Sequence, residues 1–329
     1  MQVCSSIIRI KNMEGLLCIM KRIYLSPLRY PGAKRQIAHH IEKLLKEYGC
    51  TGNVFVEPCC GGASVSLYLL EHKVVSSVIL ADKDPWVASF WKVLFTQTDD
   101  LLSDINNVEV SVQQWKDFRA NAPQTTREKA LYCFFFNRTC YSGILDGGMI
   151  GGHSQTSRYK IDCRFNKPEL MERIKWIADQ FASKVQVLPP VSVFDILEQA
   201  KSEEYEDRVY YIDPPYVSIH LYPHNFRKAE HQKLKASLEE FRKPWILSYH
   251  EHPQILQMYG SNTSLEHSSL NVLWVAERAK TGKELLINNL SSVRNKQPLP
   301  PSSLSPSQHA LWETSVSVVS DKEELLAET

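Results

Sequence analysis

The chain has 329 residues, a hydrophobic fraction of 43% and a net charge of +1. This length and composition allow a large buried core, and the near-neutral charge excludes a polycation that binds nucleic acid over its whole surface. Eight cysteines without C-x-x-C spacing favour a reduced, cytoplasmic protein without a disulfide framework or a bound metal. Because no apolar run reaches the ~18 residues of a membrane-spanning helix, we expect no membrane partner.

The first part of the chain follows the order of a nucleotide-binding α/β unit. The residue pattern predicts a helix over 33–48, a strand over 53–57 and a helix over 64–72. A second strand over 77–81 ends in Asp82, and another helix begins near Pro85. This order of elements is typical of one half of a parallel sheet.

The loop after the first predicted strand carries the glycine pair Gly61 and Gly62. Glycines there let a ligand approach the backbone at the start of a helix. Neither G-x-x-x-x-G-K-[ST] nor G-x-G-x-x-G occurs in the chain, which argues against ATP and NAD and favours S-adenosylmethionine, a nucleoside without phosphates. Asp82 stands where a carboxylate accepts from both ribose hydroxyls. The alternative is a helix N-cap, a role that Asp84 also fits.

Residues 97–184 interrupt the alternation of strands and helices. They read as a mostly helical insertion that contains a polar, glycine-rich loop over 143–157. Further strands are expected near 185–188, 209–212, 245–248, 272–276 and 285–289, with helices around 230–241 and after Pro253.

The strand over 209–212 ends abruptly in Asp213-Pro214-Pro215-Tyr216. Two prolines cannot continue a central ladder, so the segment forms a stiff turn at the carboxyl end of a buried strand, where α/β sheets bind ligands. Its carboxylate, its free carbonyl and its aromatic ring suit a flat base with an exocyclic amine. A strand that merely ends beside a buried tyrosine, or a Pro-Pro-Tyr ligand for a WW domain, is the alternative interpretation.

Together these motifs resemble the D12-class, Dam-like DNA adenine-N6 methyltransferases over roughly residues 25–290. The matching segments include Arg29–Lys34, Val56–Ala63, Ile79–Asp84, Phe135–Gly143 and Asp213–Tyr216. The resemblance implies a Rossmann-like S-adenosylmethionine-dependent methyltransferase sheet with an inserted, mostly helical target-recognition domain. It also implies that the enzyme methylates the N6 amine of an adenine flipped out of double-stranded DNA.

The resemblance further assigns roles to individual residues. Those implied to bind the cofactor are Tyr30, Lys34, Glu57, Pro58, Gly61, Gly62, Asp82, Asp195 and Asp213. Those implied to hold the target adenine are Asp213, Pro214, Pro215 and Tyr216. Those implied to lie against DNA are Asn137, Arg138, Tyr141 and Ser142, with Tyr141 inserted into the duplex. From the residues alone, Lys34 remains either a functional contact or a surface lysine.

The expected organisation is an N-terminal extension (1–22), a discontinuous catalytic domain (23–96 and 185–290), a DNA-binding insertion (97–184) and a C-terminal linker and tail (291–329). We expect a monomer in a bacterial or phage-infected cell, with a cognate restriction endonuclease as a candidate partner. Cytosine-N4 methylation, RNA methylation and a catalytically idle DNA-binding regulator are the alternative functions.

Overall fold

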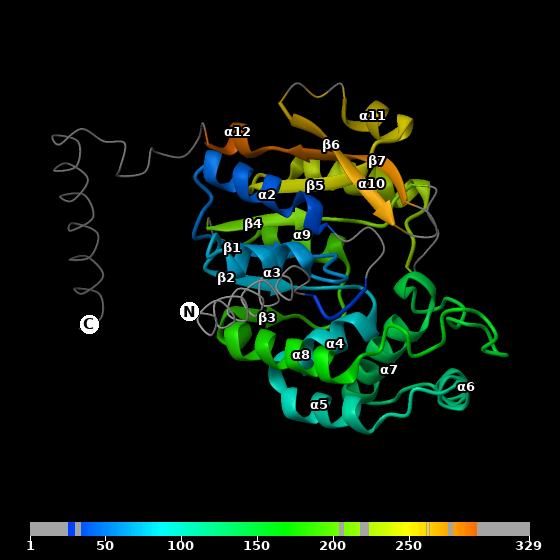
Figure 1. Ribbon diagram of the computed structural model, residues 1–329. Helices are drawn as coiled ribbons and strands as arrows, with labels where there is room; N and C mark the ends of the chain where they lie inside the picture. The colour runs from blue at the N-terminus through cyan, green and yellow to red at the C-terminus, as the bar shows by residue number, and fades with distance from the viewer. Residues whose placement is uncertain are drawn as a thin grey trace, which may run out of the picture.

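The computed structural model of the protein describes residues 26–29, 34–203, 207–217, 224–260, 262, 264–275 and 279–294. Their strands form one sheet in the order β3-β2-β1-β4-β5-β7-β6 (Figure 1). Every pair of neighbours is parallel except those of β7, which runs antiparallel to β5 and to β6. The strands are β1 (Val54–Glu57), β2 (Ser77–Leu80), β3 (Val185–Val187), β4 (Arg208–Ile212), β5 (Trp245–His250), β6 (Glu266–Val275) and β7 (Ala279–Asn288).

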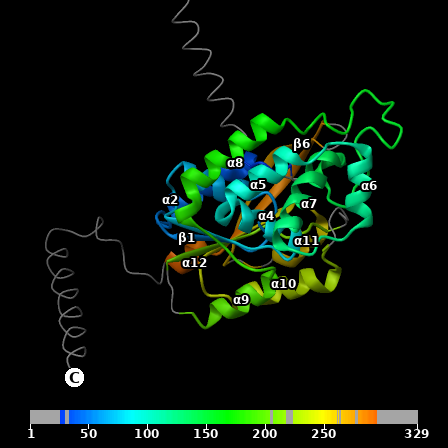
Figure 2. The ribbon, with the colours of Figure 1, turned by 90° about the horizontal axis from the view of Figure 1, so that it is seen from below.

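Helices cover both faces of this sheet, with α9 and α10 on the face opposite α2, α4, α5 and α8 (Figure 2). The helices of the sheet layers are α2 (Arg35–Glu47), α3 (Ser64–Glu71), α4 (Pro85–Thr96), α9 (Val193–Lys201), α10 (Lys228–Glu240), α11 (Pro253–Tyr259) and α12 (Leu290–Arg294). Those of the insertion are α5 (Thr98–Asn107), α6 (Val112–Ala120), α7 (Thr126–Thr139) and α8 (Lys167–Phe181), with the short 3-10 turns η1 (Tyr141–Gly143) and η2 (Ala182–Lys184).

Two hydrophobic clusters fill the spaces between the layers. Successive strand residues point to opposite faces, so Phe55 and Tyr211 join the cluster that contains α2, α3 and α4. Val56 and Tyr210 join the cluster that contains α9, α10 and α11. Burial on both faces explains why the strands read as continuous apolar runs rather than as alternating patterns.

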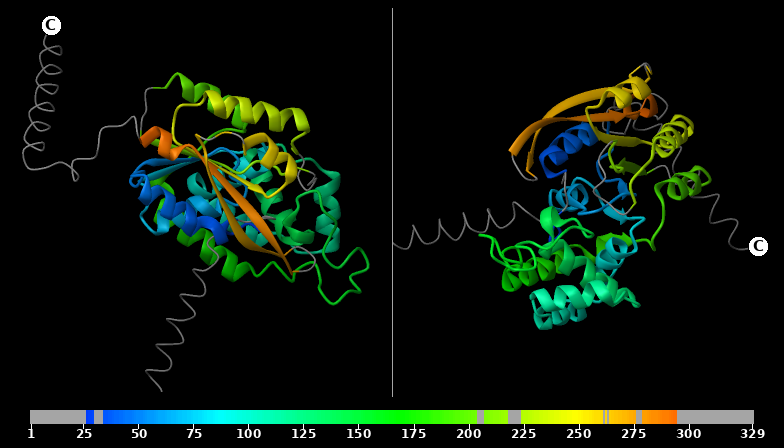
Figure 3. Two further views of the ribbon diagram at one scale, coloured as in Figure 1. Left: turned by 90° about the horizontal axis from the view of Figure 1, so that it is seen from above. Right: turned by 90° about the vertical axis from the view of Figure 1, so that its right-hand side faces the viewer.

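The insertion forms a helical lobe beside the β3 edge of the sheet, on the opposite side of the molecule from the β6–β7 hairpin (Figures 1 and 3). Its helices α5, α7 and α8 pack against α4 and extend the same hydrophobic cluster. A capping box fixes the start of α7, because Thr125 accepts from the backbone N–H of Glu128 and Glu128 accepts from that of Thr125. The expected Rossmann-like sheet with a mostly helical insertion is therefore confirmed.

Several expectations need adjustment or fall outside the structure. β6 begins at Glu266, earlier than the strand expected near 272–276, because it pairs with the full length of β7. The expected extension (1–22) and the part of the expected tail beyond residue 294 lie outside the described residues. Among the described helices, none combines the length and the apolarity needed to cross a bilayer.

Candidate active site

The Asp213–Tyr216 turn follows β4, a central strand that is buried from Val209 to Ile212. Its parallel neighbours β1 and β5 end at the same edge of the sheet, so the residues that follow them gather near Asp213. Pro214 and Tyr216 are buried, Pro215 is half-buried, and the side chain of Asp213 keeps 21% of its surface exposed. The turn therefore presents one partly accessible carboxylate on a buried support.

The carboxylate of Asp213 is held through one of its two oxygens. Oδ1 lies 3.1 Å from Nζ of Lys34 and accepts from the hydroxyl of Ser248 at 2.9 Å, and the hydroxyl oxygen of Tyr216 lies 3.1 Å away. Because Ser248 donates to Asp213, the hydroxyl of Tyr211, 3.0 Å away, donates to Ser248. Among the described residues every contact of this carboxylate uses Oδ1, so Oδ2 remains available to a further donor.

A second carboxylate, that of Glu284 on β7, lies behind the turn and is only 2% exposed. It accepts a hydrogen bond from the hydroxyl of Tyr216, and its Oε1 lies 3.5 Å from Nζ of Lys34. Burial alone lowers the pKa of Lys34, but the charges of Asp213 and Glu284 outweigh burial and raise this pKa above its ordinary value. Lys34 is therefore a buried ammonium that joins two carboxylates, not a surface lysine.

Residue-by-residue reading of the sequence missed the roles of Glu284 and Ser248. The signal for Glu284 is a charged residue directly before the apolar run Leu285–Ile287 in a strand. Such a side chain is buried only with a partner. The partner itself could not be read from the pattern, because it belongs to the turn after another strand.

The glycine loop and Asp82 are joined directly. Oδ2 of Asp82 accepts from the backbone N–H of Gly61 at 2.9 Å, and the indole of Trp91 donates to the Gly61 carbonyl at 2.8 Å. The N-cap of α4 is Asp84, whose Oδ1 accepts from the N–H of Trp86 at 2.8 Å. Asp82 is thus not the helix cap, and it remains a candidate for binding ribose hydroxyls.

Glu57 ends β1 and is 3% exposed, with Ser66 of α3 donating to its carboxylate. Burial raises the pKa of Glu57 to about 8, and the charges of Asp213 and Asp82 add to this effect while Ser66 opposes it. Burial likewise raises the pKa of Asp82 to about 7, against the backbone N–H groups that stabilise its ionised form. Burial at this edge of the sheet therefore favours the protonated forms of Glu57 and Asp82.

This set of groups fits S-adenosylmethionine. Its sulfonium and ammonium groups are cationic. Four acids lie at this edge (Glu57, Asp82, Asp213 and Glu284), of which Asp213 and Glu284 share the ammonium of Lys34. The hydroxyls of a ribose are donors that a carboxylate at Asp82 accepts. Pro58, Gly61 and Gly62 are buried between β1 and α3 and form the backbone of the same loop.

Two of the expected cofactor residues are not brought to this cluster by any described contact. Tyr30 lies outside the described residues. Asp195 is exposed in the first turn of α9, where it shares a hydrogen bond of 2.6 Å with the hydroxyl of Ser192, the N-cap of that helix. The role of Asp195 towards the adenine of the cofactor stays a prediction.

The structure corrects the DNA-facing role expected for Asn137 and Arg138. Asn137 is fully buried, and its amide bonds the backbone N–H and carbonyl of Arg29 and the carbonyl of Gly143. Arg138 is 8% exposed and donates to the carbonyl of Pro27. Both side chains fasten the segment before α2 onto the end of α7, because a buried amide or guanidinium needs such partners.

The other two residues expected at DNA lie at the surface of the insertion. Tyr141 is 54% exposed at the start of η1, and Ser142 is half-buried with a φ of 55°. Gly143 follows with a φ of 76°, and a Cβ added there would lie 2.0 Å from the carbonyl oxygen of Arg29. The hydroxyl of Tyr141 accepts from the backbone N–H of Gly151 at 3.4 Å, so the ring lies against the loop of the insertion while 54% of the residue stays exposed.

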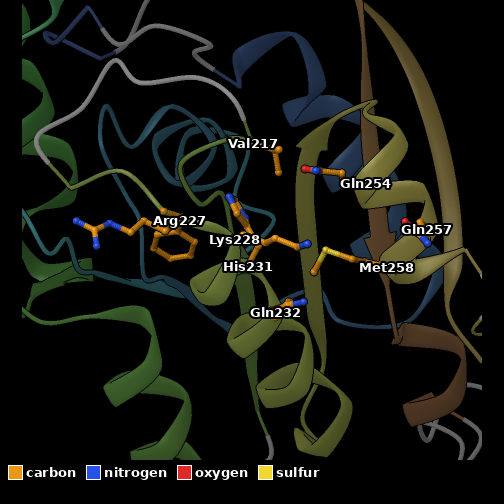
Figure 4. A pocket seen from close by; sticks show the side chains of 9 residues that line it. Val217, Arg227, Lys228, His231, Gln232, Gln254, Gln257 and Met258 are labelled. Carbon is orange, nitrogen blue, oxygen red and sulfur yellow. The ribbon is translucent and has the colours of Figure 1, made fainter.

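A cavity of about 510 Å³ lies next to the Asp213–Tyr216 turn, on the α10 and α11 side of the sheet (Figure 4). His231 and Lys228 of α10 face Gln254 and Met258 of α11 across it, with Val217 at its border. The described residues that line it do not include Glu57, Asp82 or Asp213. It is therefore separate from the acid cluster.

A Rossmann-like sheet with a glycine loop and a following acid, in a chain without a phosphate-binding loop, defines an S-adenosylmethionine-dependent methyltransferase. The profile of the D12 class N6 adenine-specific DNA methyltransferase family matches residues 30–273, and the chain belongs to this family. It is a DNA methyltransferase whose methyl donor is S-adenosyl-L-methionine and whose substrate is double-stranded DNA.

The chain is 27% identical over 209 residues to the type II methyltransferase M.MjaIII of Methanocaldococcus jannaschii, a match that covers 58% of this chain and 69% of that protein. Similar solved structures include the rRNA methyltransferase aviRa of Streptomyces viridochromogenes (TM-score 0.38, 13% identity, 82% of this chain and 90% of that one). Another is the O-methyltransferase of Bacillus cereus (TM-score 0.30, 9% identity), a match that covers 77% of this chain and 80% of that one.

Proposed function

We propose that the protein transfers the methyl group of S-adenosyl-L-methionine to the N6 amine of an adenine flipped out of duplex DNA. The observation that supports this most is the state of Asp213. Its Oδ1 is held by Lys34 and Ser248, whereas its Oδ2 has no partner among the described residues. An acceptor fixed in this way suits an incoming N–H group.

The chemistry of an aryl amine explains the remaining groups of the turn. The lone pair of the amine is delocalised into the ring, so the nitrogen is a weak nucleophile. Oδ2 of Asp213 and the carbonyl of Pro214, which lies beyond the β4–β5 pairing, accept its two N–H groups and favour a pyramidal nitrogen. When bound, S-adenosyl-L-methionine supplies an electrophilic methyl group. The residues of the turn contribute mainly by positioning the amine.

The charge around the turn favours the same reaction. Positive charge grows on the amine nitrogen as the new bond forms. Asp213 and Glu284 are two carboxylates that share the ammonium of Lys34, so this site stabilises a further positive charge. The amine proton leaves after transfer, so Asp213 acts as an acceptor and need not be a strong base.

The insertion is proposed to hold the duplex while the base is extruded. Tyr141 is an exposed aromatic ring on the insertion, and a ring inserted into the duplex offsets part of the unstacking cost of a few kcal/mol. Tyr216 is proposed to pack against the flipped base. A cognate restriction endonuclease, a monomeric state and the proposed domain boundaries stay predictions.

The experiment is to incubate the purified protein with unmethylated genomic DNA and S-adenosyl-L-methionine labelled in its methyl group, and to digest the DNA to nucleosides. We expect the label in N6-methyl-2′-deoxyadenosine. Label in N4-methyl-2′-deoxycytidine, or label in RNA from a parallel incubation but not in DNA, would replace this proposal with one of its rivals. Sequencing the DNA of a methylation-free host that expresses the protein then defines the recognition sequence.

A further inference from the structure

The proposed chemistry uses Glu284 only as a second negative charge beside Lys34, yet its carboxylate is 2% exposed and also contacts Tyr216 of the turn. β7 is inserted antiparallel between β5 and β6, and this pairing sets Glu284 opposite His250. In this way β7 carries a carboxylate to the back of the Asp213–Tyr216 turn. Burying a carboxylate costs free energy unless hydrogen bonds or an opposite charge compensate it.

The partners of Glu284 are the residues that hold Asp213. The hydroxyl of Tyr216 lies within hydrogen-bond distance of both carboxylates. A phenol has only one proton to donate, so when Glu284 accepts it, Oδ1 of Asp213 is left to Lys34 and Ser248. The hydrogen bond from Tyr216 to Glu284 therefore leaves Lys34 and Ser248 as the donors to Asp213.

The ammonium of Lys34 is fixed by the same residue. It lies 3.5 Å from Glu284 and 4.5 Å from the centre of the Tyr216 ring. Among the described residues, the titratable groups that face Lys34 include Asp213, Glu284 and Tyr216, with His250 also within electrostatic reach. Without Glu284, Asp213 is the carboxylate that remains against this ammonium.

We propose that Glu284 is a positioning residue for methyl transfer. It accepts from Tyr216 and Lys34, and through them it sets the orientation of Asp213 so that Oδ2 faces the target amine. It also keeps a second negative charge beside the site where positive charge develops. This inference rests on the proposed function, because it assigns Glu284 a part in that reaction.

The first test is single-turnover methyl transfer from protein that already holds cofactor and DNA. Glu284→Gln keeps the size of the side chain but removes its charge, and we expect the rate to fall about 10- to 100-fold with DNA and cofactor affinity unchanged. The matched control is Glu266→Gln, which alters another carboxylate of this sheet that accepts from a tyrosine hydroxyl, that of Tyr48 at 2.7 Å. Its rate should stay within about twofold of the wild type.

A double-variant cycle tests whether Glu284 acts through Tyr216. Tyr216→Phe removes the hydroxyl, and we expect the double variant with Glu284→Gln to be about as slow as the slower single variant. If the two losses multiply, or if Glu284→Gln turns over as fast as the wild type, Glu284 does not position the site. If the Glu284→Gln protein fails to fold, Tyr216→Phe carries the test, and an unchanged rate overturns the proposal.

A readout independent of turnover is the titration of Lys34, followed by the ¹³Cε chemical shift in protein labelled at lysine and assigned with Lys34→Arg. Loss of Glu284 should lower the pKa of Lys34, because it removes one of the two negative charges that raise this pKa. An unchanged titration overturns the link to Glu284. If the wild type methylates no DNA but Lys34 responds as expected, the proposed function fails while the structural link stands.

Discussion

Lys34 and Asp213 form a buried ion pair, with Nζ of Lys34 3.1 Å from Oδ1 of Asp213. The pair joins the residue before α2 to the residue after β4. It bears on the interpretation of Lys34, which the family resemblance of the chain implied to bind the cofactor. In this structure its ammonium is committed to the turn that is proposed to hold the base.

Asp213→Ala should slow methyl transfer by orders of magnitude without unfolding the protein. Lys34 keeps its contact with Glu284, so the ammonium is not left unpaired. We expect turnover to fall by about 10²- to 10⁴-fold and cofactor affinity to change little. Asp207→Ala, at an exposed position before β4, is the control. A variant at Asp213 with normal turnover would remove this residue from the mechanism.

Cofactor affinity should increase with pH. Burial raises the pKa of Asp82 to about 7, and hydroxyl donors bind its ionised form, so binding releases a proton near neutral pH. Calorimetry between about pH 6 and pH 8 should show affinity rising and then levelling off above the pKa of the free protein. Asp82→Asn should weaken binding and flatten this dependence. An equal pH dependence in the variant and the wild type would place the titrating group elsewhere.

Glu57 should make the protein without cofactor less stable at alkaline pH. Burial raises its pKa to about 8 in the folded state, so its protonated form favours folding. This contribution to the free energy of unfolding is complete below the ordinary pKa of a glutamate and is lost as the pH rises through about 8. Thermal melts of the wild type should fall over this range more than those of Glu57→Gln. Parallel curves would contradict the assignment.

Tyr141→Ala should weaken DNA binding and base extrusion. Tyr141 is 54% exposed on the insertion, and stacking on a base contributes about 1–3 kcal/mol, equivalent to a loss of affinity of about 5- to 150-fold. The fluorescence of 2-aminopurine at the target position should rise less than with the wild type. Tyr141→Phe keeps the ring and serves as the control. If both variants bind and extrude the base like the wild type, Tyr141 is not at the duplex.

Gly143→Ala should destabilise the junction between the insertion and the segment before α2. Its φ is 76°, and a Cβ there would lie 2.0 Å from the carbonyl oxygen of Arg29. We expect a loss of about 3 kcal/mol or more in the free energy of unfolding. Gly148→Ala, where nothing lies within 4 Å of the added Cβ, should cost less than about 0.5 kcal/mol. Equal denaturation midpoints for the two variants would contradict this packing.

The elements whose signals are local could be predicted from the sequence. The apolar run before Asp213-Pro214-Pro215 forms β4, and Pro214 and Pro215 end the ladder as expected. The N-cap of α4 shows the limit of such signals. Asp82 and Asp84 both fitted the role, and the structure gives it to Asp84. The choice depends on the path of the backbone, which the two residue types do not encode.

The roles expected for two residues of the insertion did not take their burial into account. Asn137 and Arg138 are polar, and the resemblance implied that they face DNA. Instead they are buried against the backbone of residues 27–29 and 143. A polar side chain can be buried when carbonyl groups from distant segments satisfy it, and sequence spacing does not reveal such partners.

By itself the sequence determined the alternation of strands and helices, the glycine loop, the acid that follows β2 and the turn that ends β4. Each of these follows from backbone and side-chain preferences that act over a few residues. Only the tertiary structure decided that β7 inserts between β5 and β6 and carries Glu284 to Tyr216 and Lys34. Strand pairing is set by the packing of the whole sheet, so the partners of a buried charge emerge only once that packing exists.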